Sequence, residues 1–307
     1  MALNLIFMGT PDFAVPILQS IKFSEHKILC VYTQTPKKKN RGQKKGLTPI
    51  HEFSKQNNLN VRHPEKLDTE EEIEFFKKEK PDVVVVVAYG KILPKRLLNI
   101  KNIQFINVHA SLLPKWRGAA PIQRAIMNLD KETGISIMKI IPKLDAGPVM
   151  MSSKIKIQKD ANYEKLSKQL SKMGSELIIT SLKLLENKKE KFIEQNEKDA
   201  TYAKKVSKDE SQINWNETAG QIIAKINALH QNPGCWFYLD GLRIKITRAI
   251  EVNGNGAPGE IIDENFVIAC GKKAIKILEL TRQGKQNMSA SNFLKGNKIP
   301  IGTNLNK

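Results

Sequence analysis

The run DVVVVVA, Asp82 to Ala88, contains five consecutive valines and decides the fold class. A strand that is apolar at every position has no solvent-facing side, so it belongs inside a parallel sheet covered by helices on both faces. The stretch before it, Thr69 to Lys80, has acidic residues first and lysines last, as the helix dipole favours. This alternation of strands and helices predicts a doubly wound α/β domain with a mostly parallel sheet.

The first strand is expected at Leu3 to Met8, followed by the turn Gly9-Thr-Pro-Asp-Phe. Thr10 fits a helix N-cap, and Pro11 fits the first helical position. Because the turn has a single glycine and lacks G-x-G-x-x-G, it does not imply a dinucleotide. Ligands of such sheets bind beyond the carboxyl ends of the strands. Tyr89-Gly90 fall at such an end.

Polar side chains also end the next strand candidate, IQFIN from Ile103. Asn107 and His109 are two residues apart and therefore share one face of a strand. An amide and an imidazole so placed can donate hydrogen bonds to a reacting carbonyl or move a proton for it. A single histidine there is more often a boundary residue than a catalytic one. Asp145, in the turn-rich segment IPKLDAGP, supplies a carboxylate, although turn aspartates are common. The three together form a moderately specific catalytic set.

The segments NVHASLLPKWRGAAPIQRAI, from Asn107, and ETGISIMKIIPKLDAGPVM, from Glu132, resemble the folate-dependent formyltransferases. The likeness runs from Leu3 to about residue 300. The segments NLIFMGTPDFAVPIL and VVVVVAYGKILPK are similar to the branch of this family that acts on methionyl-tRNA. The resemblance implies transfer of a formyl group from 10-formyltetrahydrofolate to the amino group of methionyl initiator tRNA. It makes Asn107, His109 and Asp145 the catalytic residues.

The same resemblance implies a folate site along the loop that follows the catalytic strand. We expect the folate to contact a loop and a neighbouring strand end, formed by Ser111, Leu112, Leu113, Pro114, Tyr89 and Gly90. No metal is expected, because the three cysteines are far apart, with no C-x-x-C pair and no histidine at ligand spacing. We interpret Cys30, Cys235 and Cys270 as reduced structural thiols.

The net charge of +19 is large enough to suggest a polyanionic partner. Lysine outnumbers arginine by 42 to 8, however, which a genome of biased base composition explains equally well. The loop QTPKKKNRGQKKGLTP is more informative, since it has six basic residues and no acidic one. Such loops are most often only solvated, but this one resembles the family's basic loop that reaches the tRNA acceptor end. The expected tRNA-binding residues are Lys37, Lys38, Lys39, Arg41, Lys44 and Lys45.

A chain of 307 residues favours two domains. We expect a catalytic domain at 1–187, closed by a long amphipathic helix, then a polar, exposed linker at 188–210. Short strands separated by glycine-containing turns suggest a small barrel at 211–307. By the resemblance it is an OB-like tRNA-binding domain after a Rossmann-like one. Basic residues recur on its strands and could line one face: Arg243, Lys245, Arg248, Lys272, Lys273 and Lys276.

The remaining expectations concern the cellular compartment, the oligomeric state and alternative functions of the protein. No apolar run is long enough to span a membrane, and the N-terminus lacks a basic region and a cleavage site, so we expect a cytoplasmic protein. We assume a monomer, since no sequence pattern addresses the oligomeric state. One alternative is formylation of a small amine, such as a nucleotide sugar or glycinamide ribonucleotide, which would need neither the basic loop nor the barrel. Another is an inactive RNA-binding protein, which the occupied catalytic positions disfavour.

Overall fold

The computed structural model describes residues 2–38, 45–230 and 232–306, which form two compact units. The first unit comprises Met1–Pro121, Thr133–Ile155 and Ser167–Ala203. The second unit comprises Ile122–Glu132, Lys156–Leu166 and Lys204–Lys307. Each unit has its own apolar core.

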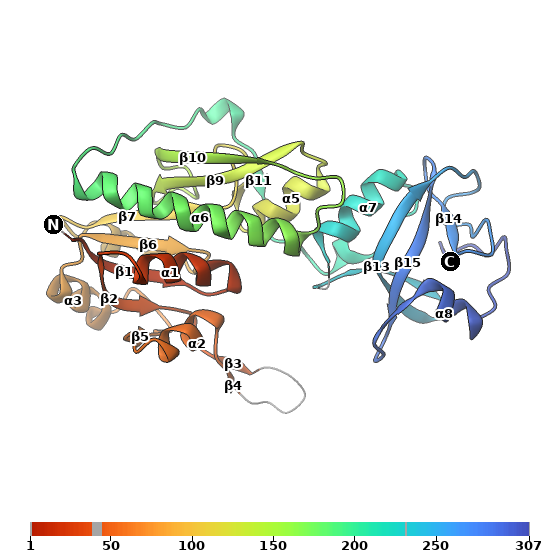
Figure 1. The fold of residues 1–307 in the computed structure, drawn as a ribbon, viewed down its shortest axis with the longest axis horizontal. Helices are drawn as coiled ribbons and strands as arrows, with labels where there is room; N and C mark the ends of the chain where they lie inside the picture. Colours follow the sequence, from red (N-terminus) through yellow and green to blue (C-terminus); the bar gives the residue numbers. More distant parts are fainter. Residues whose placement is uncertain (1, 39–44, 231, 307) are drawn as a thin grey trace. The chain divides into compact units, whose positions relative to one another are not determined.

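The first unit is built on a seven-stranded sheet of order β10-β9-β7-β6-β1-β2-β5 (Figure 1). Neighbours from β7 to β5 pair in parallel, and β9 joins β7 antiparallel. The chain starts in the middle of the sheet, builds one side, and returns to build the other. The predicted α/β fold with a mostly parallel sheet is confirmed. The strands are β1 (Asn4–Gly9), β2 (Lys27–Tyr32), β5 (Val61–Arg62), β6 (Val83–Val87), β7 (Gln104–His109), β9 (Glu132–Lys139) and β10 (Val149–Lys156).

Helices cover both faces of this sheet, as the valine run requires. All five valines of β6 are buried. Val84 and Val86 pack in one cluster with Ile73 and Phe76 of α3 (Glu70–Glu79). On the other face, α6 (Tyr163–Glu186) approaches so closely at Gly174 that an added Cβ would meet Val108 of β7 at 3.3 Å. The other helices of the first 130 residues are α1 (Val15–Lys22), α2 (Pro49–Gln56), α4 (Lys95–Leu98) and α5 (Pro121–Met127).

The first helix does not begin as the sequence suggested. A short 3-10 turn, η1 (Asp12–Ala14), precedes α1, and neither has a side-chain cap. The Thr10 hydroxyl instead donates to the carbonyl oxygen of Tyr89 at 2.9 Å. The predicted N-cap at Thr10 is wrong, because this long-range hydrogen bond takes the side chain that a cap would use.

The second unit contains a curled antiparallel sheet of order β12-β13-β15-β14, with β16 beside β15 (Figure 1). Its core gathers Trp215, Phe237, Phe266 and Phe293. The predicted β-rich C-terminal domain is confirmed as this open half-barrel. Its elements are α7 (Ala219–Ala228), β12 (Cys235–Leu239), β13 (Leu242–Val252), β14 (Val267–Ala269), β15 (Ala274–Arg282), β16 (Asn287–Ser289) and α8 (Ala290–Lys295).

Two small ribbons complete the first unit. In one, β3 (Lys37–Lys38) pairs antiparallel with β4 (Lys45–Gly46). In the other, β8 (Arg117–Gly118) pairs in parallel with β11 (Tyr202–Ala203), which lies within the segment predicted to be a linker. The 3-10 turns η2 (Glu197–Asp199) and η3 (Asp209–Ser211) flank β11. Among the described residues, no helix is long and apolar enough to cross a membrane.

Candidate active site

The three predicted catalytic side chains meet at the carboxyl end of β7. The amide nitrogen Nδ2 of Asn107 lies 3.5 Å from Oδ1 of Asp145. The imidazole nitrogen Nδ1 of His109 lies 3.7 Å from Oδ2 of the same carboxylate. Asn107 and His109 share one face of the strand, as their spacing predicted, and Asp145 comes from the loop between β9 and β10. An amide, an imidazole and a carboxylate are thereby held within reach of one small group.

The orientation of His109 is fixed by the loop that follows its strand. Its Nε2 lies 2.9 Å from the carbonyl oxygen of Trp116. A carbonyl oxygen only accepts hydrogen bonds, so Nε2 carries a proton. The other nitrogen, Nδ1, is the one that faces Asp145. With only 6% of the His109 side chain exposed and 18% of the Asp145 side chain, both groups are largely shielded from water.

Asp145 is fixed by a backbone donor. The N–H of Gly118 donates to its Oδ2 at 2.8 Å. Gly118 has φ +119°, and an added Cβ would lie 2.8 Å from the carbonyl oxygen of Ala203, so only glycine fits. Asp145 itself adopts a left-handed conformation with φ +45°, which aspartate tolerates better than most residues.

The predicted folate loop is held by hydrogen bonds and is partly exposed. Ser111 is buried, and its hydroxyl donates to the carbonyl oxygen of Lys115 at 2.6 Å. The Ser136 hydroxyl donates to the carbonyl oxygen of Ser111 and accepts from the N–H of Leu113. Leu112, Leu113 and Pro114 are each partly exposed. Ser111 thus holds the loop internally, and the partly exposed side chains at 112–114 are apolar.

Tyr89 and Gly90 follow β6 at the point where the strand order reverses. The Tyr89 side chain is buried in the core, and burial raises the pKa of its phenol to about 12. Its carbonyl oxygen accepts hydrogen bonds from Thr10 and Gln34. Gly90 is exposed with φ +80°, and a Cβ there would lie 2.3 Å from Nε2 of Gln34. A ligand at this position would therefore meet backbone and not the tyrosine ring.

The predicted tRNA residues divide into two groups. Lys37, Lys38 and Lys45 lie on the β3–β4 ribbon. Lys39, Arg41 and Lys44 lie outside the described residues.

In the second unit, the basic residues of the strands differ in their partners. Arg248 pairs with Glu279, and Lys273 pairs with Glu251. Arg243 lies 4.3 Å over the ring of Trp236, and burial together with Arg243 lowers the pKa of the neighbouring Lys245. Among the described residues of β13, Arg243 and Lys245 are thus the cations without a carboxylate partner, and Lys272 and Lys276 have none either.

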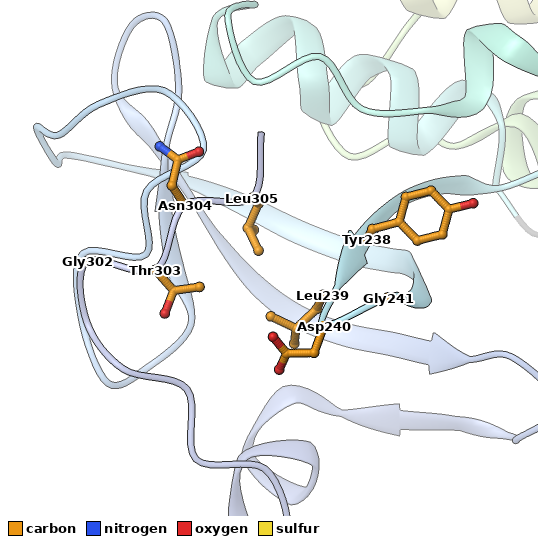
Figure 2. A pocket seen from close by; sticks show the side chains of 8 residues that line it. All are labelled: Tyr238, Leu239, Asp240, Gly241, Gly302, Thr303, Asn304 and Leu305. Atoms are coloured by element: carbon orange, nitrogen blue, oxygen red, sulfur yellow. The ribbon is translucent and has the colours of Figure 1, made fainter. Parts of the chain in front are cut away.

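Two other features lie away from the catalytic set. Glu25, His26 and Glu186 place ligand atoms within 4.8 Å of one another, near the amino end of β2, whereas the predicted catalytic set lies at the carboxyl end of β7. In the second unit, a hollow of about 490 Å³ lies beside the turn at Asp240-Gly241 (Figure 2). Its lining contains no basic side chain, so it does not suit a phosphate backbone.

All three cysteines are free and buried, as predicted. Burial raises the pKa of the Cys30 and Cys235 thiols to about 12 and that of Cys270 to about 11. Thiols of this kind are unreactive at neutral pH.

The sequence analysis did not identify the residues that hold the backbone around the predicted catalytic side chains. Arg117 is fully buried, and Gln195 and Glu197 hold its guanidinium. Arg117 stands in the segment that carries the family resemblance, but nothing in the sequence marks its side chain as buried or names its partners.

A mostly parallel sheet with an Asn–His–Asp set at a strand end, followed by a half-barrel, defines the class of formyl transferases. The family model described as "Formyl transferase" matches residues 3–182, and the model "Formyl transferase, C-terminal domain" matches residues 205–298. A methionyl-tRNA formyltransferase of Pelagibacter ubique is 48% identical over 307 residues, covering 99% of each chain. One of Paramagnetospirillum magneticum is 43% identical over 302 residues, covering 98% of this chain and 99% of its own. The chain belongs to the methionyl-tRNA formyltransferase family.

Solved structures share the fold at much lower identity. HypX from Aquifex aeolicus, in complex with tetrahydrofolic acid, superimposes with a TM-score of 0.67 at 16% identity, over 99% of this chain and 51% of its own. The sugar 3N-formyl transferase WlaRD, crystallised with dTDP and 5-N-formyl-THF, gives 0.67 at 20% identity, over 93% of this chain and 100% of its own.

Proposed function

We propose that this enzyme transfers the formyl group of 10-formyltetrahydrofolate to the α-amine of methionine on initiator tRNA. Asn107, His109 and Asp145 carry the reaction. The observation that supports these roles most directly is that one carboxylate lies beside both the amide and the imidazole, at 3.5 and 3.7 Å. The full-length relatives named methionyl-tRNA formyltransferase support the substrate.

The chemistry follows from the donors that the site presents. The amine attacks the formyl carbon and forms a tetrahedral intermediate with a negatively charged oxygen. The Asn107 amide and the protonated His109 stabilise this oxygen by donating hydrogen bonds. Because Nε2 of His109 is occupied by Trp116, Nδ1 is the nitrogen that acts on the reacting group. As the C–N bond to folate breaks, the proton lost by the amine passes to the leaving folate nitrogen, directly or through a water, with Asp145 assisting.

The folate is proposed to lie against Leu112, Leu113 and Pro114, with Ser111 and the Tyr89-Gly90 backbone completing the site. This position is supported by the reversal of strand order between β1 and β6, where such sheets bind their ligands. The hydrogen bond from Thr10 to the Tyr89 carbonyl ties the two strand ends together there. The partly exposed leucines supply an apolar wall, as small-ligand sites generally do.

The tRNA is proposed to contact the basic loop and the half-barrel. The lysines of the loop attract its phosphates, and Arg41 acts at the acceptor end. In the second unit, Arg243 and Lys245 are the cations best placed to take a phosphate. We assign catalysis to residues 1–187, the connection to 188–210 and tRNA binding to 211–307, in a cytoplasmic monomer that needs no metal.

A comparison of acceptors tests this function. The purified protein is given formylated folate and, separately, methionyl initiator tRNA, methionyl elongator tRNA, free methionine and an amino-sugar nucleotide. We expect fast transfer to methionyl initiator tRNA and slower transfer to the others. Faster formylation of the amino sugar would show that the substrate is a small amine and not methionyl-tRNA. Binding of tRNA without transfer to any acceptor would show that the protein binds RNA and is not an enzyme.

A further inference from the structure

Three consecutive residues support the catalytic side chains from one side. The carbonyl oxygen of Trp116 accepts the Nε2 proton of His109, and the N–H of Gly118 donates to Asp145. Between them, the Arg117 side chain has no exposed surface. The conformation of this short segment therefore sets the positions of both catalytic groups.

The buried Arg117 is held by two side chains from residues that follow α6. Its Nε donates to Oε1 of Gln195 at 3.0 Å. Its two terminal nitrogens donate to the two carboxylate oxygens of Glu197 at 3.2 and 2.9 Å, a bidentate arrangement. Burial acts to lower the pKa of the guanidinium, but hydrogen bonds and charge interactions with Glu197 and Tyr202 together outweigh it, and the pKa is raised. Arg117 therefore stays charged and ordered.

Gln195 also holds the backbone of the turn that carries the catalytic carboxylate. Its amide nitrogen Nε2 donates to the carbonyl oxygens of Asp145 at 2.9 Å and Gly147 at 2.6 Å. Both amide hydrogens and the amide oxygen of Gln195 are thus engaged. These contacts form a closed ring. It runs from the Asp145 carboxylate to the N–H of Gly118, along the chain to Arg117, and through Gln195 back to the Asp145 carbonyl. It holds the left-handed turn at Asp145 from both ends.

The backbone of the same segment continues these contacts. Thr201 accepts from the N–H of Trp116 with its hydroxyl and from the N–H of Arg117 with its carbonyl, both at 2.9 Å. The carbonyl oxygen of Ala203 accepts from the N–H of Ala119 at 2.9 Å. At the other end, Ile193 bridges to Val149 of β10. We call residues 193–203 the strap.

We propose that the strap is part of the active site, with Gln195 and Arg117 as positioning residues that hold Asp145 and His109 in register. This inference rests on the proposed function for the reaction it serves. Neither side chain touches the reacting group. Their effect reaches the chemistry through Trp116, Gly118 and the Asp145 turn.

Two substitutions at Gln195 test this. Gln195→Met removes the contacts to Arg117 and to Asp145 together. Gln195→Glu keeps an acceptor for Arg117 but cannot donate to the carbonyls of Asp145 and Gly147. Because misplaced catalytic groups cost turnover, we expect both variants to lower kcat by about tenfold to a hundredfold, with KM for both substrates near wild type. Lys143→Met is the matched control, since Lys143 contacts Glu197 from its exposed side.

A second measurement is independent of activity. Hydrogen exchange of the peptide that contains Gly118 reports whether its N–H still donates to Asp145. We expect faster exchange in both Gln195 variants and no change in Lys143→Met. Wild-type kcat and exchange in Gln195→Glu would overturn the proposal, as would a loss in Lys143→Met equal to that in Gln195→Met. If the wild-type enzyme does not formylate methionyl-tRNA, the proposed function fails, while the exchange data still decide whether the strap holds the site.

Discussion

The backbone N–H of Gly118 donates to Oδ2 of Asp145 at 2.8 Å, so a loop glycine orients the carboxylate proposed to act with His109. The other oxygen of that carboxylate lies 3.5 Å from Nδ2 of Asn107. One acidic side chain thereby links the loop to both of the groups that face the formyl oxygen in the proposed mechanism.

Asp145→Asn keeps the shape of this side chain and removes its charge, so it should show what the charge contributes to turnover. An asparagine oxygen can still accept from Gly118, but the negative charge beside His109 is lost. We expect turnover to fall by about a hundredfold or more, with the fold retained. Asp240→Asn is a matched control, because Asp240 has a similar φ of +48° in the turn of the second unit. A pH–rate profile of Asp145→Asn with the wild-type shape would contradict an electrostatic role.

Leu113→Trp should weaken folate binding and spare tRNA binding. Leu113 is partly exposed on a loop whose backbone is fixed by Ser136, so a larger side chain must occupy space that the ligand needs. We expect affinity for a folate analogue to fall by about tenfold or more, measured by titration. The same change at Ile301, exposed in the second unit, should leave affinity unaltered. Wild-type affinity in Leu113→Trp would remove the loop from the site.

The basic loop should contribute in two separable ways. Neutralising Lys37, Lys38 and Lys45 should weaken tRNA binding and flatten its dependence on salt, because each phosphate contact contributes to that slope. Arg41→Lys keeps the charge but loses the planar guanidinium. We expect it to reduce kcat/KM on initiator tRNA more than bulk tRNA affinity. Similar losses for Arg41→Lys and for the neutralised lysines would show that the loop acts only through its positive charge.

Acid should release the strap. Hydrogen bonds from Arg117 and then Lys143 hold the pKa of Glu197 at about 2, against 4.5 for a free glutamate. A lowered carboxylate pKa stabilises the fold fully above pH 4.5, and this stabilisation is lost as pH falls towards 2. The difference in thermal unfolding midpoint between wild type and Glu197→Gln should therefore be constant above pH 5 and shrink below pH 4.5. A difference that does not change down to pH 2 would contradict this ion pair.

The sequence predicted the parts of the site that depend on local pattern. Five valines require a covered strand, and a spacing of two places Asn107 and His109 on one face. Asp145 joined them as a turn carboxylate, which its local pattern alone could not single out, and the family resemblance then implied its catalytic role.

The strap could not be predicted in this way. Gln195 and Glu197 stand in a polar stretch without periodicity, and their partner Arg117 is 78 and 80 residues away. Thr10 shows the same limit, because its local capping preference yields to a hydrogen bond with Tyr89, 79 residues along the chain. Contacts of this range depend on how the strands are ordered, and short sequence patterns do not encode that order.

Single-turnover formyl transfer from 10-formyltetrahydrofolate to methionyl initiator tRNA, compared between wild type, Asn107→Ala and His109→Ala, tests the central claim most directly. Each substitution removes one donor to the developing oxyanion, so each should slow the transfer step by about a hundredfold or more. Binding of the folate and of the tRNA, measured separately, should stay close to wild type. Transfer rates near wild type in both variants would show that the chemistry occurs elsewhere on the protein.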